Sequence, residues 1–277
     1  MSFLRLSIIL NRTAGLPTVW SNCLAGWWLG GGGNPRRLPF LFAGATFLYL
    51  GGTFLNDAFD GKFDRQPCGA QATTAFAFRG WGLVFLALGT VMLFWLGKVT
   101  GGFGVALAFC IILCYVISRL AVFSGLLAGV SRLFLYLIAA STGTNGITGW
   151  AIWCGLALAV YVVGVNCFMR QEKAAGLGRH WPILMLAVPI LLALIMNDDG
   201  RREAGLLLSA ILALWTVRCL RHALWTAEKD FAASVSGLLA GIVFVDLLAV
   251  ADAPKVISLI FFLLFGATCL FQRRSAA

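Results

Sequence analysis

The chain has 277 residues, of which 60% are hydrophobic and only 12% charged, and its mean hydropathy is +0.91. Soluble domains are about 45–50% apolar and about 25% charged, so the composition excludes an ordinary soluble protein and predicts an integral membrane protein. The net charge of +10 arises mostly from Lys and Arg in short loops that face lipid headgroups. No basic run with interleaved aromatic residues indicates a nucleic acid partner. Eight scattered cysteines and two histidines form no zinc-binding pattern.

Residues 1–15 predict an amphipathic segment on the membrane face rather than a cleaved signal peptide. Apolar runs long enough to cross a bilayer then follow almost without pause. They cover residues 16–33, 38–57, 79–97, 101–118, 122–140, 147–168, 181–197, 203–220, 233–250 and 255–271. The sequence therefore predicts an all-α polytopic transmembrane bundle of nine to ten spans, forming a single domain over residues 1–277.

Lys and Arg are unevenly distributed between the two sides of this bundle. With an even number of spans both termini share one side, and that side carries 14 basic residues against 6 on the other. The first set is Arg5, Arg12, Lys62, Arg65, Arg79, Arg119, Arg170, Lys173, Arg179, Arg218, Arg221, Lys229, Arg273 and Arg274. The excess of positive charge predicts that both termini are cytoplasmic.

Three of the acidic residues fall within eight positions at the cytoplasmic end of the second predicted span: Asp57, Asp60 and Asp64. If the helix continues, Asn56, Asp60 and Asp64 stack at i, i+4 spacing with Asp57 beside them. Three carboxylates on one face repel each other at a membrane surface. Oxygen ligands without His or Cys are typical of Mg²⁺. The alternative is a solvated helix end in which neighbouring Lys and Arg neutralise the acids.

Two enzyme classes carry such clusters at a membrane surface. The CDP-alcohol phosphotransferases share Asp57, Asp60, Gly61 and Arg65 with this segment, but their last two aspartates are replaced here, so half of that signature is missing. The full pattern Asn56-Asp57-x-x-Asp60-x-x-x-Asp64 instead resembles the N-D-x-x-D-x-x-x-D motif of the UbiA superfamily of intramembrane prenyltransferases.

Further segments are similar to a bacterial, EboC-like subgroup of that superfamily. They are Leu16-Pro17-Thr18-Val19-Trp20-Ser21-Asn22, Arg132-x-x-x-Tyr136, Tyr161-x-x-Gly164 and Arg170-x-Glu172. The resemblance implies Mg²⁺-dependent transfer of an isoprenyl group from a prenyl diphosphate to a lipophilic acceptor. It also implies an active site on the cytoplasmic face of a bacterial inner membrane.

Carried onto this chain, the resemblance implies a set of site residues. The expected metal ligands are Asn56, Asp57, Asp60 and Asp64, and the expected catalytic residues are Asp57, Asp60, Asp64 and Arg132. The expected substrate-binding residues are Asn22, Arg65, Arg119, Tyr136, Asn166, Arg170 and Glu172. The family has a second, Asp-rich motif, which corresponds here to residues 166–173. In this chain only Glu172 of that segment is acidic. Arg65, Arg119 and Arg170 match the geometry of phosphate oxygens, although each also fits a role in membrane topology.

Two charged residues lie inside predicted spans, where charge is costly and usually faces a cavity or a partner. Arg132 reaches a substrate from inside the bundle in one interpretation and pairs with Asp246 in the other.

The degraded second motif leaves open a non-catalytic protein of the same fold that binds or moves a prenyl lipid. An unrelated transporter is a weaker alternative, because matching halves with broken helices are not found.

Overall fold

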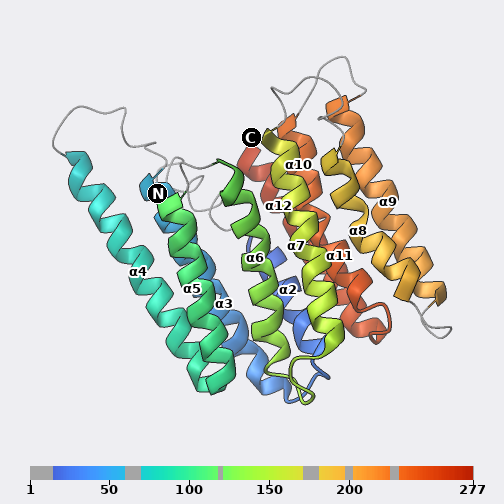
Figure 1. The fold of residues 1–277 in the computed structure, drawn as a ribbon, viewed down its shortest axis with the longest axis horizontal. Coiled ribbons are helices and arrows are strands. Elements are labelled where there is room, and N and C mark those ends of the chain that lie inside the picture. The colour runs from blue at the N-terminus through green and yellow to red at the C-terminus, as the bar shows by residue number, and fades with distance from the viewer. Residues whose placement is uncertain are drawn as a thin grey trace.

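A computed structural model describes residues 15–59, 70–117, 121–170, 181–196, 202–224 and 231–276, and every element within them is helical. The elements are α2 (Leu16–Leu29), the short 3₁₀ helix η1 (Pro35–Arg37), α3 (Leu38–Phe59), α4 (Ala70–Leu96), α5 (Lys98–Ile117), α6 (Ala121–Ala140), α7 (Gly149–Arg170), α8 (Trp181–Met196), α9 (Arg202–Leu224), α10 (Phe231–Ala240), α11 (Ile242–Ala249) and α12 (Lys255–Ala276). The helices run in alternating directions through one bundle, with α10 and α11 together forming one interrupted pass (Figure 1).

Six of the described helices are long and apolar enough to cross a membrane, namely α3, α4, α5, α7, α9 and α12. Three shorter apolar segments, Gly125–Ala140, Trp181–Ile195 and Ala233–Ala249, run alongside them (Figure 1). Large apolar side chains remain exposed on the outside of the bundle, including Trp95 at 82% and Ile195 at 81%. An exterior of this kind requires lipid as its solvent. The protein is therefore a helical bundle embedded in a membrane.

Each predicted apolar run coincides with helix, but the first helix is shorter than its run of 16–33. α2 ends at Leu29 because Gly31, Gly32 and Gly33 have positive φ values of +89°, +66° and +131°, which residues with a side chain rarely adopt. The backbone N–H of Asn145 donates to the carbonyl of Gly30 at 2.8 Å. This turn is thereby tied to the segment that joins α6 to α7.

The run predicted at 233–250 is divided into two helices at Gly241. The Tyr161 hydroxyl donates to the carbonyl of Leu238 at 2.9 Å, so a side chain of α7 occupies the space beside the break. A Cβ atom on Gly241 would lie 2.6 Å from that hydroxyl. After the break, α11 packs against α2 and carries the fully buried Asp246.

α2 is the central helix of the bundle. It contacts α3, α6, α7, α11 and α12, and ten of its 14 residues are buried. Three polar residues, Thr18, Ser21 and Asn22, are almost completely enclosed, at 2%, 0% and 0% exposure. Polar groups buried in this way require hydrogen-bond partners from the surrounding helices.

Close packing of α2 against α6 depends on Gly26. A Cβ atom on this residue would lie 2.7 Å from the carbonyl oxygen of Tyr136 and 2.9 Å from the Cβ of Ala139. Small residues allow helix backbones to approach in this way inside membranes. The sequence spacing of Gly26 and Gly30 predicts such a face.

Replacement of Gly26 by alanine is expected to lower the free energy of unfolding by about 1–3 kcal/mol, because the added methyl group forces α2 away from α6. Denaturant titration of the detergent-solubilised protein measures this change. Gly102→Ala is the matched control, since a Cβ there meets nothing within 4 Å. Equal stability of the two variants would contradict close packing at this interface.

Candidate functional site

The predicted metal motif begins in the last turn of α3. The helix continues to Phe59, so Asn56 and Asp57 are helical, and Asn56 is exposed at the end of the bundle. The side chain of Asp57 and all of Asp60, Asp64 and Arg65 lie outside the described residues. The structure therefore places the start of the motif.

A cavity of about 230 Å³ opens beside the start of the motif. Its walls come from α2, α3, α5 and α6, and they are mainly apolar. The lining residues are Val19, Ala45, Leu48, Tyr49, Gly52, Thr53, Asn56, Leu107, Ile111, Cys114, Ala128, Ser131, Arg132 and Leu135. One face of α3, with a period of three to four residues, supplies the wall that ends in Asn56. The same cavity therefore touches Asn56 and Arg132.

Arg132 is held against the wall of this cavity by α2. Its Nη1 donates to Oδ1 of Asn22 at 2.7 Å, and its Nη2 donates to the Thr18 hydroxyl at 3.1 Å. The Thr18 hydroxyl in turn donates to the carbonyl of Gly15 at 2.8 Å. A guanidinium has five N–H donors, and within the described part of the chain only two of Arg132's have partners. Three donors thus remain for a ligand in the cavity.

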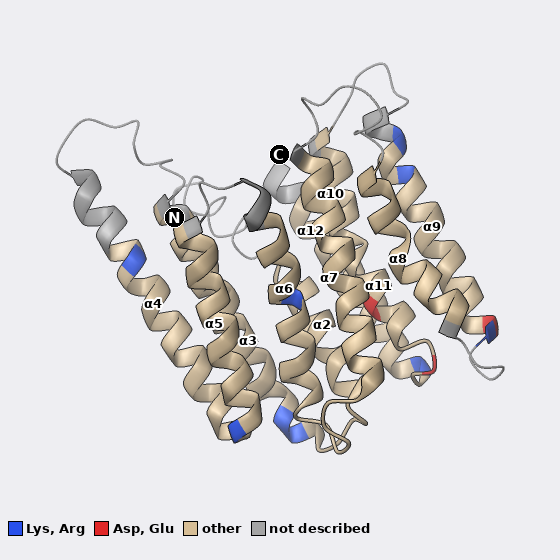
Figure 2. Cartoon of the chain, in the orientation of Figure 1, with Lys and Arg blue, Asp and Glu red and all other residues tan. Residues whose placement is uncertain are grey.

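Asp246 lies on the other side of Asn22, fully buried. Its Oδ1 accepts from the Tyr136 hydroxyl at 2.6 Å, and its Oδ2 accepts from Nδ2 of Asn22 at 2.7 Å. The Ser21 hydroxyl donates to the same Oδ2. The expected alternative of a direct Arg132–Asp246 ion pair is not what the structure contains, because the amide of Asn22 lies between the two charges. Arg132 lies on α6 and Asp246 on α11, and Figure 2 shows basic colour partway along α6 and acidic colour on α11, away from the ends of the bundle.

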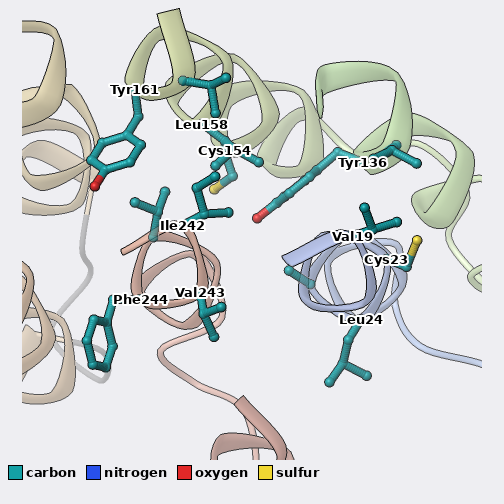
Figure 3. Close-up of a cluster of buried hydrophobic side chains, with 14 of the residues drawn as sticks. Val19, Cys23, Leu24, Tyr136, Cys154, Leu158, Tyr161, Ile242, Val243 and Phe244 are labelled. Atoms are coloured by element: carbon teal, nitrogen blue, oxygen red, sulfur yellow. The ribbon is translucent and has the colours of Figure 1, made fainter. Parts of the chain in front are cut away.

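Among the remaining predicted site residues, the structure describes Tyr136, Asn166 and the backbone of Arg170. Tyr136 is fully buried, and its hydroxyl points into the space between α2 and α11 (Figure 3). Asn166 bonds within its own helix, donating to the carbonyl of Val162 at 2.9 Å. Arg170 is the last residue of α7, and its side chain is not described. Arg119 and Glu172 lie outside the described residues.

The donor set of the motif is consistent with Mg²⁺, which prefers oxygen ligands and retains water and substrate phosphate in its shell. The described part of the chain contains no group of three or more His, Cys, Asp or Glu that could hold a metal. Of the expected ligands, only the side chain of Asn56 is described. Its exposed amide carries one of the oxygen atoms that such a site uses.

Two residues of the central network were not among those predicted from the sequence. Thr18 and Ser21 share a face of α2 with Asn22, at i, i+3 and i, i+4 spacing. This polar stripe inside an otherwise apolar helix was a signal that could have identified both.

Comparisons with family models, with curated proteins and with solved structures give no match to this chain.

Proposed function

We propose that this protein is an Mg²⁺-dependent intramembrane prenyltransferase of the UbiA type, which transfers an isoprenyl group from a prenyl diphosphate to a lipophilic acceptor. In this proposal the six long helices are joined by α6, α8 and the α10–α11 pair as spans, which gives nine, or ten when α2 is counted. Both termini and the start of the α3 motif face the cytoplasm of a bacterial inner membrane.

One observation carries the proposal: a single cavity is lined by Asn56 of the acidic motif, by Arg132 and otherwise mainly by apolar side chains. A prenyl diphosphate has the matching parts, an anionic head and an apolar tail. Guanidinium N–H groups bind phosphate oxygens strongly and with defined geometry. The apolar wall accepts the tail and excludes water from the reacting carbon.

In the proposed reaction, the bond between C1 of the prenyl group and the diphosphate oxygen breaks, and its electron pair leaves with diphosphate. A nucleophilic atom of the acceptor forms the new bond to C1 and loses one proton. The motif residues Asn56, Asp57, Asp60 and Asp64 would hold Mg²⁺, which would supply positive charge to stabilise the departing diphosphate. Arg132 contributes fixed positive charge from inside the bundle, and Asn56, the first residue of the motif, lines the same cavity.

The function is tested by incubating the purified protein with radiolabelled prenyl diphosphates of several chain lengths, Mg²⁺ and a membrane lipid extract. Release of diphosphate together with a new prenylated lipid, identified by its mass, supports the proposal. Saturable binding without either product indicates a non-catalytic prenyl-lipid binding protein. Absence of both binding and turnover with every chain length contradicts the proposal and its alternative.

The thiol of Cys114 provides a second measurement, because this residue lines the cavity beside Arg132. In a variant that keeps only this cysteine, alkylation by a small maleimide is expected to slow by about tenfold at a ligand concentration ten times Kd. Farnesyl diphosphate with Mg²⁺ is the ligand to use. A variant that keeps only Cys269, on α12 and away from the cavity, should be alkylated at an unchanged rate. Unprotected Cys114 at saturating ligand would place the substrate elsewhere.

A further inference from the structure

The structure assigns to Asp246 a positioning role: through the amide of Asn22 it orients the guanidinium of Arg132 toward the cavity, where an anionic ligand binds. This inference rests on the proposed function in taking a prenyl diphosphate as that ligand. It concerns a residue that does not line the cavity. Asp246 is fully buried. In sequence it is 110 residues from one hydrogen-bond partner, Tyr136, and 225 residues from another, Ser21.

The first step is the orientation of the Asn22 amide. Its two ends differ, because the oxygen can only accept hydrogen bonds and the nitrogen can only donate them. On one side lies the carboxylate of Asp246, an acceptor, and on the other lies the guanidinium of Arg132, a donor. Only one of the two amide orientations satisfies both neighbours. Asp246 thereby fixes the oxygen of Asn22 toward Arg132.

The second step concerns charge. A guanidinium inside a membrane is costly without a compensating negative charge. Direct contact with a carboxylate would supply that charge, but it would also place a negative group against the guanidinium and weaken its attraction for an anionic ligand. With Asn22 between them, Asp246 compensates Arg132 at a distance, and the two donors of Arg132 that bind protein groups are satisfied by the neutral side chains of Asn22 and Thr18. The arrangement combines a buried positive charge with an open binding edge.

The third step distinguishes positioning from simple electrostatics, because the two predict opposite changes in anion affinity when Asp246 is replaced. Removing a negative charge near a binding site strengthens the attraction for an anion. Loss of positioning has the opposite consequence, since the Asn22 nitrogen then has no acceptor to hold it and the amide can swing away from Arg132. Asp246→Leu removes both acceptor oxygens, whereas Asp246→Asn removes the charge but keeps one oxygen that can accept from Asn22. The two variants therefore have different expected effects.

The experiment uses the full chain, labelled with ¹⁵N-arginine, in lipid nanodiscs. The guanidinium signal of Arg132 is identified by its loss in Arg132→Lys. In the wild type we expect slow rotation of the guanidinium, seen as separate signals for its Nη groups. In Asp246→Leu the rotation should become fast, so that these signals merge into one. In Asp246→Asn the rotation should stay slow. The affinity for farnesyl diphosphate should fall about tenfold in Asp246→Leu, the loss of one ordinary hydrogen bond, and should stay at or above the wild-type value in Asp246→Asn.

Ser21→Ala is the matched control, because Ser21 donates to the same oxygen of Asp246 but does not contact Arg132. It should leave the Arg132 signal and the affinity unchanged. Asp246→Ala is prepared beside Asp246→Leu, so that the result does not depend on the folding of one variant. An unchanged Arg132 signal in both, or an equal loss in Ser21→Ala, overturns the inference. If the signals respond as expected but the wild type binds no prenyl diphosphate, the positioning role stands and the proposed function fails.

Discussion

Replacement of Asp60 by alanine is expected to abolish Mg²⁺-dependent binding of a prenyl diphosphate, weakening it by more than about 100-fold. Asp60 is central in the motif that begins at Asn56, four positions after that residue in the sequence. Removing a group that only hydrogen-bonds to a metal ligand already lowers metal affinity by about 10- to 100-fold. Removing a carboxylate that binds the metal directly should lower it further. Calorimetric titration of farnesyl diphosphate, with Mg²⁺ and then with EDTA, measures the metal-dependent part of the affinity.

Glu203→Ala is a suitable control for that experiment. Glu203 is an exposed acidic residue in the first turn of α9, at the end of the bundle opposite to the end of α3 (Figure 1). Its replacement changes the net charge by the same amount and should leave Mg²⁺-dependent binding intact. Unchanged binding in Asp60→Ala would count against the metal assignment and, with it, against the enzymatic proposal.

Replacement of Arg132 by alanine is expected to weaken prenyl diphosphate binding by about 1.5–3 kcal/mol, the range for a hydrogen bond to a charged group. This corresponds to roughly 10- to 150-fold in Kd. The loss should persist in EDTA, since Arg132 contacts Asn22 and Thr18 and lines the cavity independently of the metal ligands. Arg132→Lys should recover part of the affinity, because lysine keeps the charge but lacks the planar fork.

Arg79→Ala controls for the loss of one positive charge. Arg79 is exposed in the first half of α4, a helix that starts at the end of the bundle where α3 finishes (Figure 1). Its removal should have little effect, since exposed charges are screened by salt over about a Debye length. If the affinity of Arg132→Ala equals that of the wild type, Arg132 has only a structural role.

The helices could be predicted well because an apolar exterior in lipid demands long runs of apolar residues, and those runs are visible without any tertiary information. Their ends were less predictable. The end of α2 at Leu29 depends on three glycines in the left-handed region, and the break before α11 depends on the hydroxyl of Tyr161, contributed by a different helix. Boundaries of this kind arise from contacts between elements, which a linear pattern does not contain.

The candidate site was predictable in part for the same reason. Arg132 and Asp246 could be singled out because charge inside a span is costly. That Asn22 lies between them could not be predicted, since the three residues come from α2, α6 and α11 and are 110 and 224 positions apart. The prediction that both termini are cytoplasmic remains a prediction, because it depends mainly on basic residues outside the described ranges.

The wide sequence separation within the central network has a consequence for biogenesis. α2 precedes α11 in the chain, and the carboxylate that completes the polar face of α2 comes with α11, 224 residues later. A nascent chain that ends before Ile242 therefore leaves Arg132 in lipid without its counter-charge. Chains truncated at this point should therefore be less stable in the membrane than the full chain, because the buried polar groups of α2 and α6 lack their acceptor.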